Sequence, residues 1–189
     1  MGSSVSLSEP PTNDWAARTN TQDYVVPRWY AAYTSARHEK SVANQLRWRG
    51  VCYFLPLLQS LQRWSDRRIR VQLPYFPGYV FVHIAHRDRL LVLQTPGVVR
   101  IVGTRTSPTV VPDVQIETLQ TALHLGLRVG PHPAAEIGRR VYIRSGPLLG
   151  TEGILLRRKG RCRVVVSIQA IMRAFAVEVN EQDIQPAPG

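Results

Sequence analysis

Arginine is the residue type in this chain whose abundance and spacing point to a chemical role. It supplies 22 of the 24 basic residues, and the formal net charge is +11. A guanidinium group binds phosphate through paired hydrogen bonds and keeps its charge at every working pH. This balance favours a polyanionic partner, most often nucleic acid, although basic charge alone is a weak signal of one.

Two short stretches combine these arginines with tryptophan. The first holds Arg47, Trp48 and Arg49, and the second holds Arg63, Trp64, Arg67, Arg68 and Arg70. Cations of this kind bind a phosphate backbone, and an indole ring can stack on an unpaired base. Ordinary solvation of a charged surface is the alternative interpretation of both stretches, so the sequence leaves nucleic-acid contact and solubility open.

Catalytic residue patterns are missing from the sequence. Acidic residues are few and scattered, and the chain has no phosphate-binding loop, dinucleotide motif or nucleophile motif. The histidines lack metal-ligand spacing with cysteine or acid; they are His38, His83, His86, His124 and His132. We therefore expect no enzyme, no metal and no cofactor.

The first arginine–tryptophan stretch lies on an expected helix, and the second on an expected hairpin. Helical spacing runs from Ser35, the expected N-cap, to Gly50, the expected stop. The hairpin spans 57–73, with its turn near Ser65 and Asp66. Further strands are expected at 28–34, 51–55, 79–84 and 98–102, and further helices at 86–94 and 113–125. Strands with segregated helices predict an α+β unit.

The stretch from Pro74 to Val82 organises this unit. After its prolines and glycine set a turn, side chains alternate between two faces, because a strand has a period of two. Val80 and Val82 share one face, and Tyr79 and Phe81 share the other. Either both faces are buried in the core, or the two aromatic rings form an exposed seat for the apolar surface of a partner.

The chain divides into four parts by composition. Residues 1–26 are expected to be a flexible tail, 27–125 the first domain, 126–136 a linker rich in glycine and proline, and 137–189 a second domain. Five short strands in the second domain predict a small β-barrel.

Two distant cysteines, Cys52 and Cys162, favour a reduced, cytoplasmic setting. The sequence contains no apolar run long enough to span a bilayer, and residues 1–20 lack the apolar core of a signal peptide. We therefore expect a cytoplasmic protein without a membrane partner.

Three stretches resemble the NusG/RfaH family of transcription elongation factors. Trp29-Tyr30 with Tyr33 is similar to the opening strand of that family. The stretch from Pro74 to Val82 resembles its PLFPGYVFV signature, and the stretch from Gly138 to Ile154 resembles a KOW motif. The resemblance implies an N-terminal NGN-type antiparallel sheet with flanking helices, linked to a small C-terminal SH3-like KOW β-barrel.

The resemblance also implies partners for the N-terminal domain. A pocket formed by Tyr33, Tyr79 and Phe81 would bind the clamp helices of the RNA polymerase β′ subunit. Asp88 and Arg89 would reach the opposite jaw, in the β subunit, and so disfavour pausing or termination. The residues implied to face the upstream or non-template DNA are Arg47, Arg49, Arg67 and Arg68.

In this family the KOW domain recruits other factors. The implied recruiting residues are Gly146, Leu148, Gly150, Ile168 and Ile171, and a ribosomal protein is the implied partner. The Phe-Gly pair of general NusG proteins is missing from the loop at 167–172, which puts Rho binding in doubt. Because it lacks that pair and carries a long arginine-rich hairpin, the chain is more similar to specialised UpxY or RfaH paralogues than to general NusG proteins. Those paralogues act on selected operons. We expect a monomer.

A second hypothesis is that the chain is a KOW-containing RNA-binding or ribosome-associated protein, which would bind RNA tightly and salt-dependently without polymerase. A structural scaffold, which would bind neither, is the third hypothesis.

Overall fold

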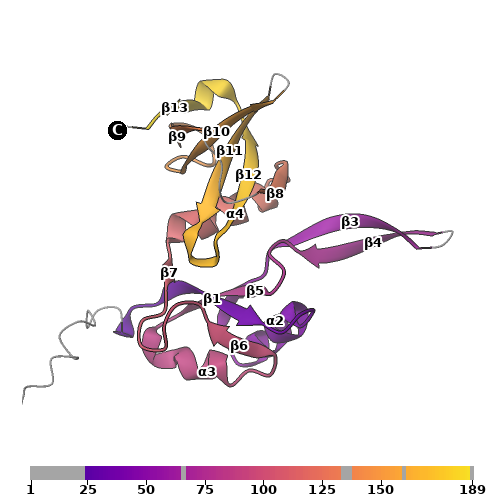
Figure 1. The fold of residues 1–189 in the computed structure, drawn as a ribbon, viewed down its shortest axis with the longest axis vertical. Coiled ribbons are helices and arrows are strands. Elements are labelled where there is room, and N and C mark those ends of the chain that lie inside the picture. Colours follow the sequence, from indigo (N-terminus) through magenta and orange to yellow (C-terminus); the bar gives the residue numbers. More distant parts are fainter. Residues whose placement is uncertain (1–23, 65–66, 133–137, 159–160, 188–189) are drawn as a thin grey trace, which may run out of the picture.

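The computed structural model describes residues 24–64, 67–132, 138–158 and 161–187. They form an N-terminal α+β unit and a C-terminal antiparallel unit, with a long hairpin that projects away from both (Figure 1). The α+β class expected from the sequence is confirmed.

The N-terminal sheet has the order β2-β5-β1-β6, and β7 also pairs with β1. All of these pairings are antiparallel. The elements of this unit are β1 (Arg28–Thr34), α2 (Glu39–Trp48), β2 (Cys52–Phe54), β3 (Leu57–Trp64), β4 (Arg67–Pro74), β5 (Tyr79–Ile84), the 3-10 turn η2 (His86–Asp88), α3 (Arg89–Leu93), β6 (Val98–Ile101) and β7 (Val110–Val111). The hairpin is a separate two-stranded sheet of β3 and β4.

The alternation of side chains in β1 and β5 produces two different cores. On one face Val80 and Val82 pack with Tyr30, Val42 and Leu46. Val42 and Leu46 are four residues apart, so both lie on the sheet-facing side of α2. Each such fully buried side chain contributes about 1.5–3 kcal/mol by leaving water.

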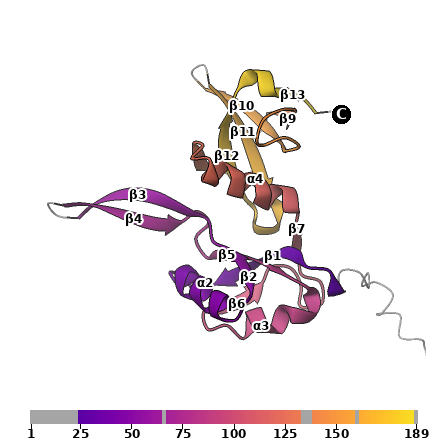
Figure 2. The same ribbon diagram turned by 180° about the vertical axis from the view of Figure 1, so that it is seen from behind.

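The aromatic face of the same sheet belongs to a second core that extends into the C-terminal unit. Ala31 and Phe81 share this cluster with Ile116, Leu119 and Phe175. Ile116 and Leu119 lie on α4 (Asp113–His124), which contacts both β1 and β11. Seen from either side, α4 lies between the two units (Figures 1 and 2).

The C-terminal unit is one antiparallel sheet in the order β13-β9-β10-β11-β12-β8. Its elements are β8 (Val129–His132), β9 (Arg139–Ile143), β10 (Glu152–Arg158), β11 (Arg161–Ile168), the 3-10 turn η3 (Gln169–Ile171), β12 (Arg173–Val179), the 3-10 turn η4 (Glu181–Asp183) and β13 (Ile184–Pro186). The expectation of several short strands in this region is confirmed, with β8 as an additional strand that the sequence analysis did not separate from the linker.

The expected linker at 126–136 is partly structured. Val129 and Gly130 pair with Val177 and Ala176, which makes β8 an edge strand of the C-terminal sheet. Residues 133–137 lie outside the described part of the chain. Glycine and proline indicated a linker locally, but the pairing depends on β12, more than 40 residues further along the chain.

Helix α2 begins at Glu39, four residues after the expected N-cap Ser35. The Ser35 N–H donates to the carbonyl of Gly97 (2.8 Å), and Arg37 adopts a left-handed conformation with φ of 63°. These features hold residues 35–38 as a turn between β1 and the helix.

Replacing Leu46 by alanine tests the helix-side core. Because Leu46 is fully buried, Leu46→Ala should lower the free energy of unfolding by about 2–5 kcal/mol in urea denaturation. Trp48 on the same helix is 89% exposed, so the control Trp48→Ala should change it by less than about 0.5 kcal/mol. Equal losses in the two variants would contradict this assignment of the faces.

Candidate functional site

The three expected pocket residues lie in different environments. Tyr33 is 37% exposed, Tyr79 is half-buried, and Phe81 is fully buried. Tyr33 lies opposite Tyr79 in the register of β1 and β5, and their ring centroids are 5.4 Å apart. The exposed aromatic seat expected from the sequence is therefore open only at the Tyr33 and Tyr79 end.

Phe81 is enclosed by other rings and by the second core. Its ring lies 5.9 Å from that of Phe76, edge to face, and 6.3 Å from that of Phe54. Ile116 and Leu119 of α4 belong to the same buried cluster. The sequence could not show this cover, because the period of a strand predicts two apolar faces but not what lies against each one.

A groove of about 820 Å³ opens beside Tyr33, at the base of the hairpin. Its walls combine the end of β1, the start of α2, the hairpin and the turn before β5. The lining residues are Tyr33, Thr34, Ala36, Arg37, Glu39, Lys40, Leu58, Gln72, Leu73, Pro74, Tyr75, Pro77, Gly78 and Pro131. The groove is concave and largely apolar, and four residues from the start of the signature stretch at 74–82 line it: Pro74, Tyr75, Pro77 and Gly78.

Gly78 holds the floor of this groove together. Its N–H donates to the buried carboxylate of Glu39 (2.7 Å), and its carbonyl accepts from the N–H of Thr34 (2.8 Å). Its φ of 85° is left-handed, and a Cβ at this position would lie 3.2 Å from Cε2 of Tyr33. A glycine therefore allows both the turn and the close approach of the Tyr33 ring.

Tyr33 is also oriented from β6. The guanidinium carbon of Arg100 lies 5.5 Å from the centroid of the Tyr33 ring, within the range of a cation–π interaction. Arg100, which faces Tyr33 in the β1–β6 register, was not identified from the sequence. Its position opposite Tyr33 depends on strand pairing, so local spacing gave no signal.

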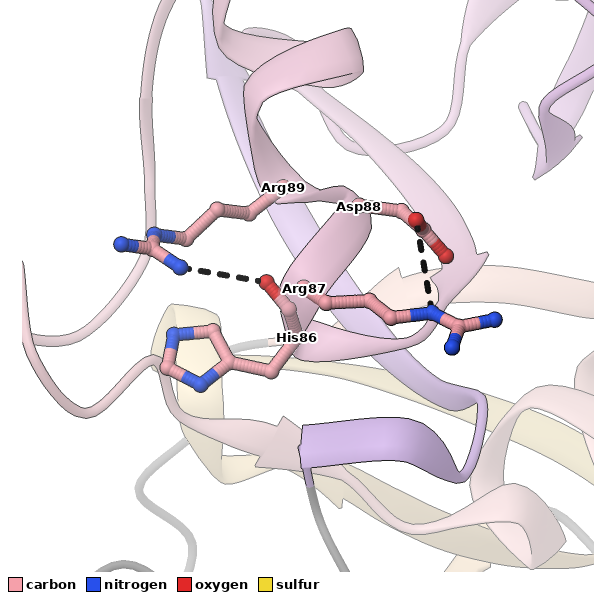
Figure 3. A network of polar contacts seen from close by, with 4 residues as sticks. All are labelled: His86, Arg87, Asp88 and Arg89. Carbon is pink, nitrogen blue, oxygen red and sulfur yellow. Dashed lines mark hydrogen bonds and ion pairs between the residues drawn. The ribbon is translucent and has the colours of Figure 1, made fainter. Parts of the chain in front are cut away.

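In the turn that carries Asp88 and Arg89, polar side chains interact with other groups of the same turn (Figure 3). Arg87 Nε lies 3.7 Å from Asp88 Oδ1, and an Nη atom of Arg89 donates to the carbonyl of His86 (3.4 Å). Burial, and secondarily the charge of Arg89, lower the pKa of His86. Asp88 and Arg89 are half-buried, whereas Arg87 is exposed, so Arg87 is the side chain of this turn most available to a partner.

The expected DNA-contact residues lie on two elements. Arg47 and Arg49 are exposed near the end of α2, on either side of Trp48, which is the most exposed large apolar side chain among the described residues at 89%. An Nη atom of Arg49 donates to the carbonyl of Gln94 (3.4 Å). Arg67 and Arg68 lie in β4 opposite Trp64 and Arg63, but their side chains are outside the described part of the structure.

The expected recruiting residues of the C-terminal unit are mostly core residues. Leu148, Ile168 and Ile171 are buried and belong to the same cluster as Phe81. Turn η3, which holds Ile171, contacts β7 of the N-terminal unit. Gly146 and Gly150 are exposed, with left-handed φ values of 85° and 90°.

Two exposed apolar side chains lie next to these buried ones. Leu149 is 60% exposed and Met172 is 81% exposed. Neither is among the recruiting residues expected above, although Met172 ends the loop at 167–172, because a turn residue adjacent to a buried one has no periodic signal.

Within the described residues, no group of three or more His, Cys, Asp or Glu side chains could hold a metal ion. Cys52 is exposed, Cys162 is buried, and both are free. In the same part of the chain, no helix is both long and apolar enough to cross a bilayer. The arrangement is that of a binding protein: an aromatic groove, a basic helix and a projecting hairpin.

Comparison with known proteins identifies the class of binding protein. Residues 27–120 match the family described as "Transcription termination factor nusG". A relative from Rickettsia felis, named transcription termination/antitermination protein NusG, is 22% identical over 175 residues, covering 85% of this chain and 90% of the relative. A relative of the same name from Deinococcus radiodurans is 26% identical over 170 residues, covering 74% and 90%.

A solved structure, described as domain interaction in Thermotoga maritima NusG, is 20% identical to the chain. The structural alignment covers 86% of this chain and 98% of the Thermotoga maritima chain, with a TM-score of 0.48. On the family match, the chain belongs to the NusG family. The family consists of non-catalytic transcription factors, in agreement with the expectation of no enzyme. The UpxY or RfaH subtype stays a prediction.

Gly78→Ala tests the close approach beneath Tyr33. We expect the free energy of unfolding to fall by more than about 1 kcal/mol, because a left-handed alanine is strained and its Cβ displaces the Tyr33 ring. The control Gly50→Ala has a φ of 68° and open space around its Cβ, so it should cost only the backbone strain, about 1 kcal/mol. Equal urea midpoints for the two variants would contradict the role of Gly78.

Proposed function

We propose that this protein is a transcription elongation or antitermination factor that binds RNA polymerase without catalysis and reduces pausing or termination. The observation that carries the proposal is the groove beside Tyr33, which the start of the stretch at 74–82 helps to line. Its occupant would be the clamp helices of the β′ subunit, because a largely apolar concave surface suits one face of a helix. Family membership and the names of its relatives support this assignment.

The open end of the aromatic face would make the first contact. Tyr33 and Pro77 are exposed, whereas Phe81 is fully buried in the cluster that also holds residues of α4. A helix that also contacted Phe81 would require α4 and the C-terminal sheet to move away from the aromatic face. The turn at Arg87, Asp88 and Arg89 would then bind the β subunit across the cleft, keeping the polymerase clamp closed.

DNA and recruited factors complete the proposal. Arg47 and Arg49 beside Trp48, with Arg67 and Arg68 on the hairpin, would contact upstream or non-template DNA. The C-terminal unit would recruit a ribosomal protein, and because Leu148, Ile168 and Ile171 are buried, direct contact with that partner would require them to become exposed. Action on selected operons, as a monomer, belongs to the same proposal.

A transcription assay across pause and terminator sites tests the function directly. Purified full-length protein should raise the fraction of RNA polymerase that reads through and shorten the pauses. Unchanged pausing and read-through at saturating protein would overturn the proposal. Tight, salt-dependent RNA binding in the absence of polymerase would instead favour the second hypothesis, an RNA-binding protein.

Tyr33→Ala tests the groove. An aromatic side chain at the centre of an interface commonly dominates binding, so we expect the Kd for core RNA polymerase to rise at least about tenfold. The control is Val110→Ala, because Val110 is similarly exposed at 40% and lies on β7, opposite Tyr30 rather than Tyr33 in the β1 pairing. If both variants bind like the wild type, the groove is not the polymerase site.

Replacing Arg47 and Arg49 together by glutamine tests the contact of α2 with nucleic acid. Each lost phosphate contact should lower the slope of log affinity against log salt by about 0.7–0.9, measured with single-stranded and duplex DNA. Arg139→Gln with Arg173→Gln, two exposed arginines of the C-terminal unit, is the matched control for net charge. An equal change of slope in the control would show that binding follows total charge rather than this helix.

A further inference from the structure

Helix α3 exposes most of its apolar side chains. Leu90 is 55% exposed, Leu91 46% and Leu93 38%, whereas Val92 is fully buried in the cluster that also holds Val42. Successive residues of a helix are about 100° apart, so the three leucines occupy the side of α3 opposite Val92. The helix lies on the side of the N-terminal unit away from the C-terminal unit (Figures 1 and 2).

The described part of the chain begins beside this helix. The Tyr24 ring meets that of His86 edge to face, with the centroids 5.8 Å apart. His86 starts the turn η2, which leads directly into α3. The side chains of Tyr24, Val25 and Val26 are exposed, so they extend the apolar surface of the leucines. A collection of exposed apolar side chains of this kind commonly marks an interaction surface.

Both ends of α3 are basic. Arg87 is exposed in the turn before the helix, and Arg89 is half-buried at its first position. At the other end, the exposed Arg49 donates to the carbonyl of Gln94, which directly follows the helix. The acidic residue of the turn, Asp88, pairs with Arg87. The surface therefore suits an occupant that combines an apolar side chain with negative charge.

The residues that precede Tyr24 have this composition. Residues 1–23 lie outside the described part of the chain. They contain three acidic residues and one arginine, a formal net charge of −2, although the whole chain is +11. Their single aromatic residue, Trp15, precedes Tyr24 by nine positions. Nine residues span at most about 30 Å, which is enough to reach Leu90, four positions after His86.

On these observations we propose that residues 1–23 bind back onto α3 of the same molecule. The Trp15 ring packs on Leu90 and Leu91, and the neighbouring carboxylate of Asp14 lies near Arg87. The covalent connection at Tyr24 favours this occupant, because it holds the segment at a high effective concentration beside the helix.

Other occupants fit this surface less well. A second copy of the chain, bound through the same surface, would bring the arginines of the two copies together, and like charges repel. A nucleic acid would match the charge, but the exposed leucines offer no aromatic ring on which a base could stack.

A spin label in the N-terminal segment tests the contact in the full-length protein. Ala16→Cys places the label next to Trp15. The protein also carries Cys52→Ser, because Cys52 is exposed and would take up a second label, whereas Cys162 is buried. The label broadens the NMR signals of backbone amides close to it. We expect broadening in α3, at Leu90, Leu91 and Leu93, and none at two exposed residues of the C-terminal unit, Leu149 and Met172.

Variants of the segment identify the side chains that make the contact. Trp15→Ala should remove most of the broadening in α3, and the control Thr12→Ala in the same segment should leave it unchanged. Asp14→Asn should reduce the broadening at low salt and have no effect at high salt, because salt screens the attraction to Arg87. Absence of broadening in α3, or broadening that persists in Trp15→Ala, would overturn the proposal.

A mixed sample separates contact within one molecule from contact between molecules. Unlabelled protein enriched in ¹⁵N is combined with spin-labelled protein that is not enriched, so only contact between copies broadens the observed signals. Broadening of α3 in this mixture would overturn the proposal in favour of a second copy. Sharp signals in the mixture, with broadening in the singly labelled protein, would support it. No polymerase is present, so failure of this contact leaves the proposed function standing, and failure to bind polymerase leaves this contact standing.

Discussion

The antiparallel pairing of β5 with β1 is the interaction on which the rest of the structure depends. Six residue pairs align along it, from Arg28 with Ile84 to Tyr33 with Tyr79. Because side chains alternate, this one register sends Val80 and Val82 towards α2 and sends Tyr79 and Phe81 to the other side. A shift by one residue would exchange the two faces and would leave neither core filled.

The same register builds the groove beside Tyr33. It places Tyr33 beside Tyr79 at the end of both strands, where the Gly78 turn and the Glu39 carboxylate meet. The groove is thus formed where β1, α2 and the hairpin come together. Its floor is held by the Thr34–Gly78 backbone hydrogen bond and by the hydrogen bond from the Gly78 N–H to the Glu39 carboxylate.

The second core gives the aromatic face a different role from the helix-covered face. Phe81 shares its buried cluster with Ile116 and Leu119 of α4, and residues of the C-terminal sheet continue the same cluster. A buried hydrogen bond of 2.8 Å between the hydroxyls of Thr118 and Thr151 links α4 to the residue that precedes β10. Phe81 of the proposed polymerase pocket therefore belongs to the same buried cluster as Leu148, Ile168 and Ile171, the residues proposed to recruit other factors.

The sequence alone determined the local features of this protein. Alternation predicted β1 and β5, helical spacing predicted the buried side of α2, and the arginines beside Trp48 predicted an exposed basic helix. The resemblance carried by the stretch at 74–82 identified the family. These features depend on residues close together in the chain, so their periods and turn residues are visible without a structure.

Only the tertiary structure decided which surfaces are open. It made Val129–His132 a strand, enclosed Phe81 in a cluster shared with α4, and buried Leu148, Ile168 and Ile171, which the resemblance had implied as contacts. It also brought Thr34 and Tyr75, 41 positions apart, to the wall of one groove. Burial depends on partners distant in sequence, so a strand's period can predict that a face is apolar but not whether the cover is the protein itself or another molecule.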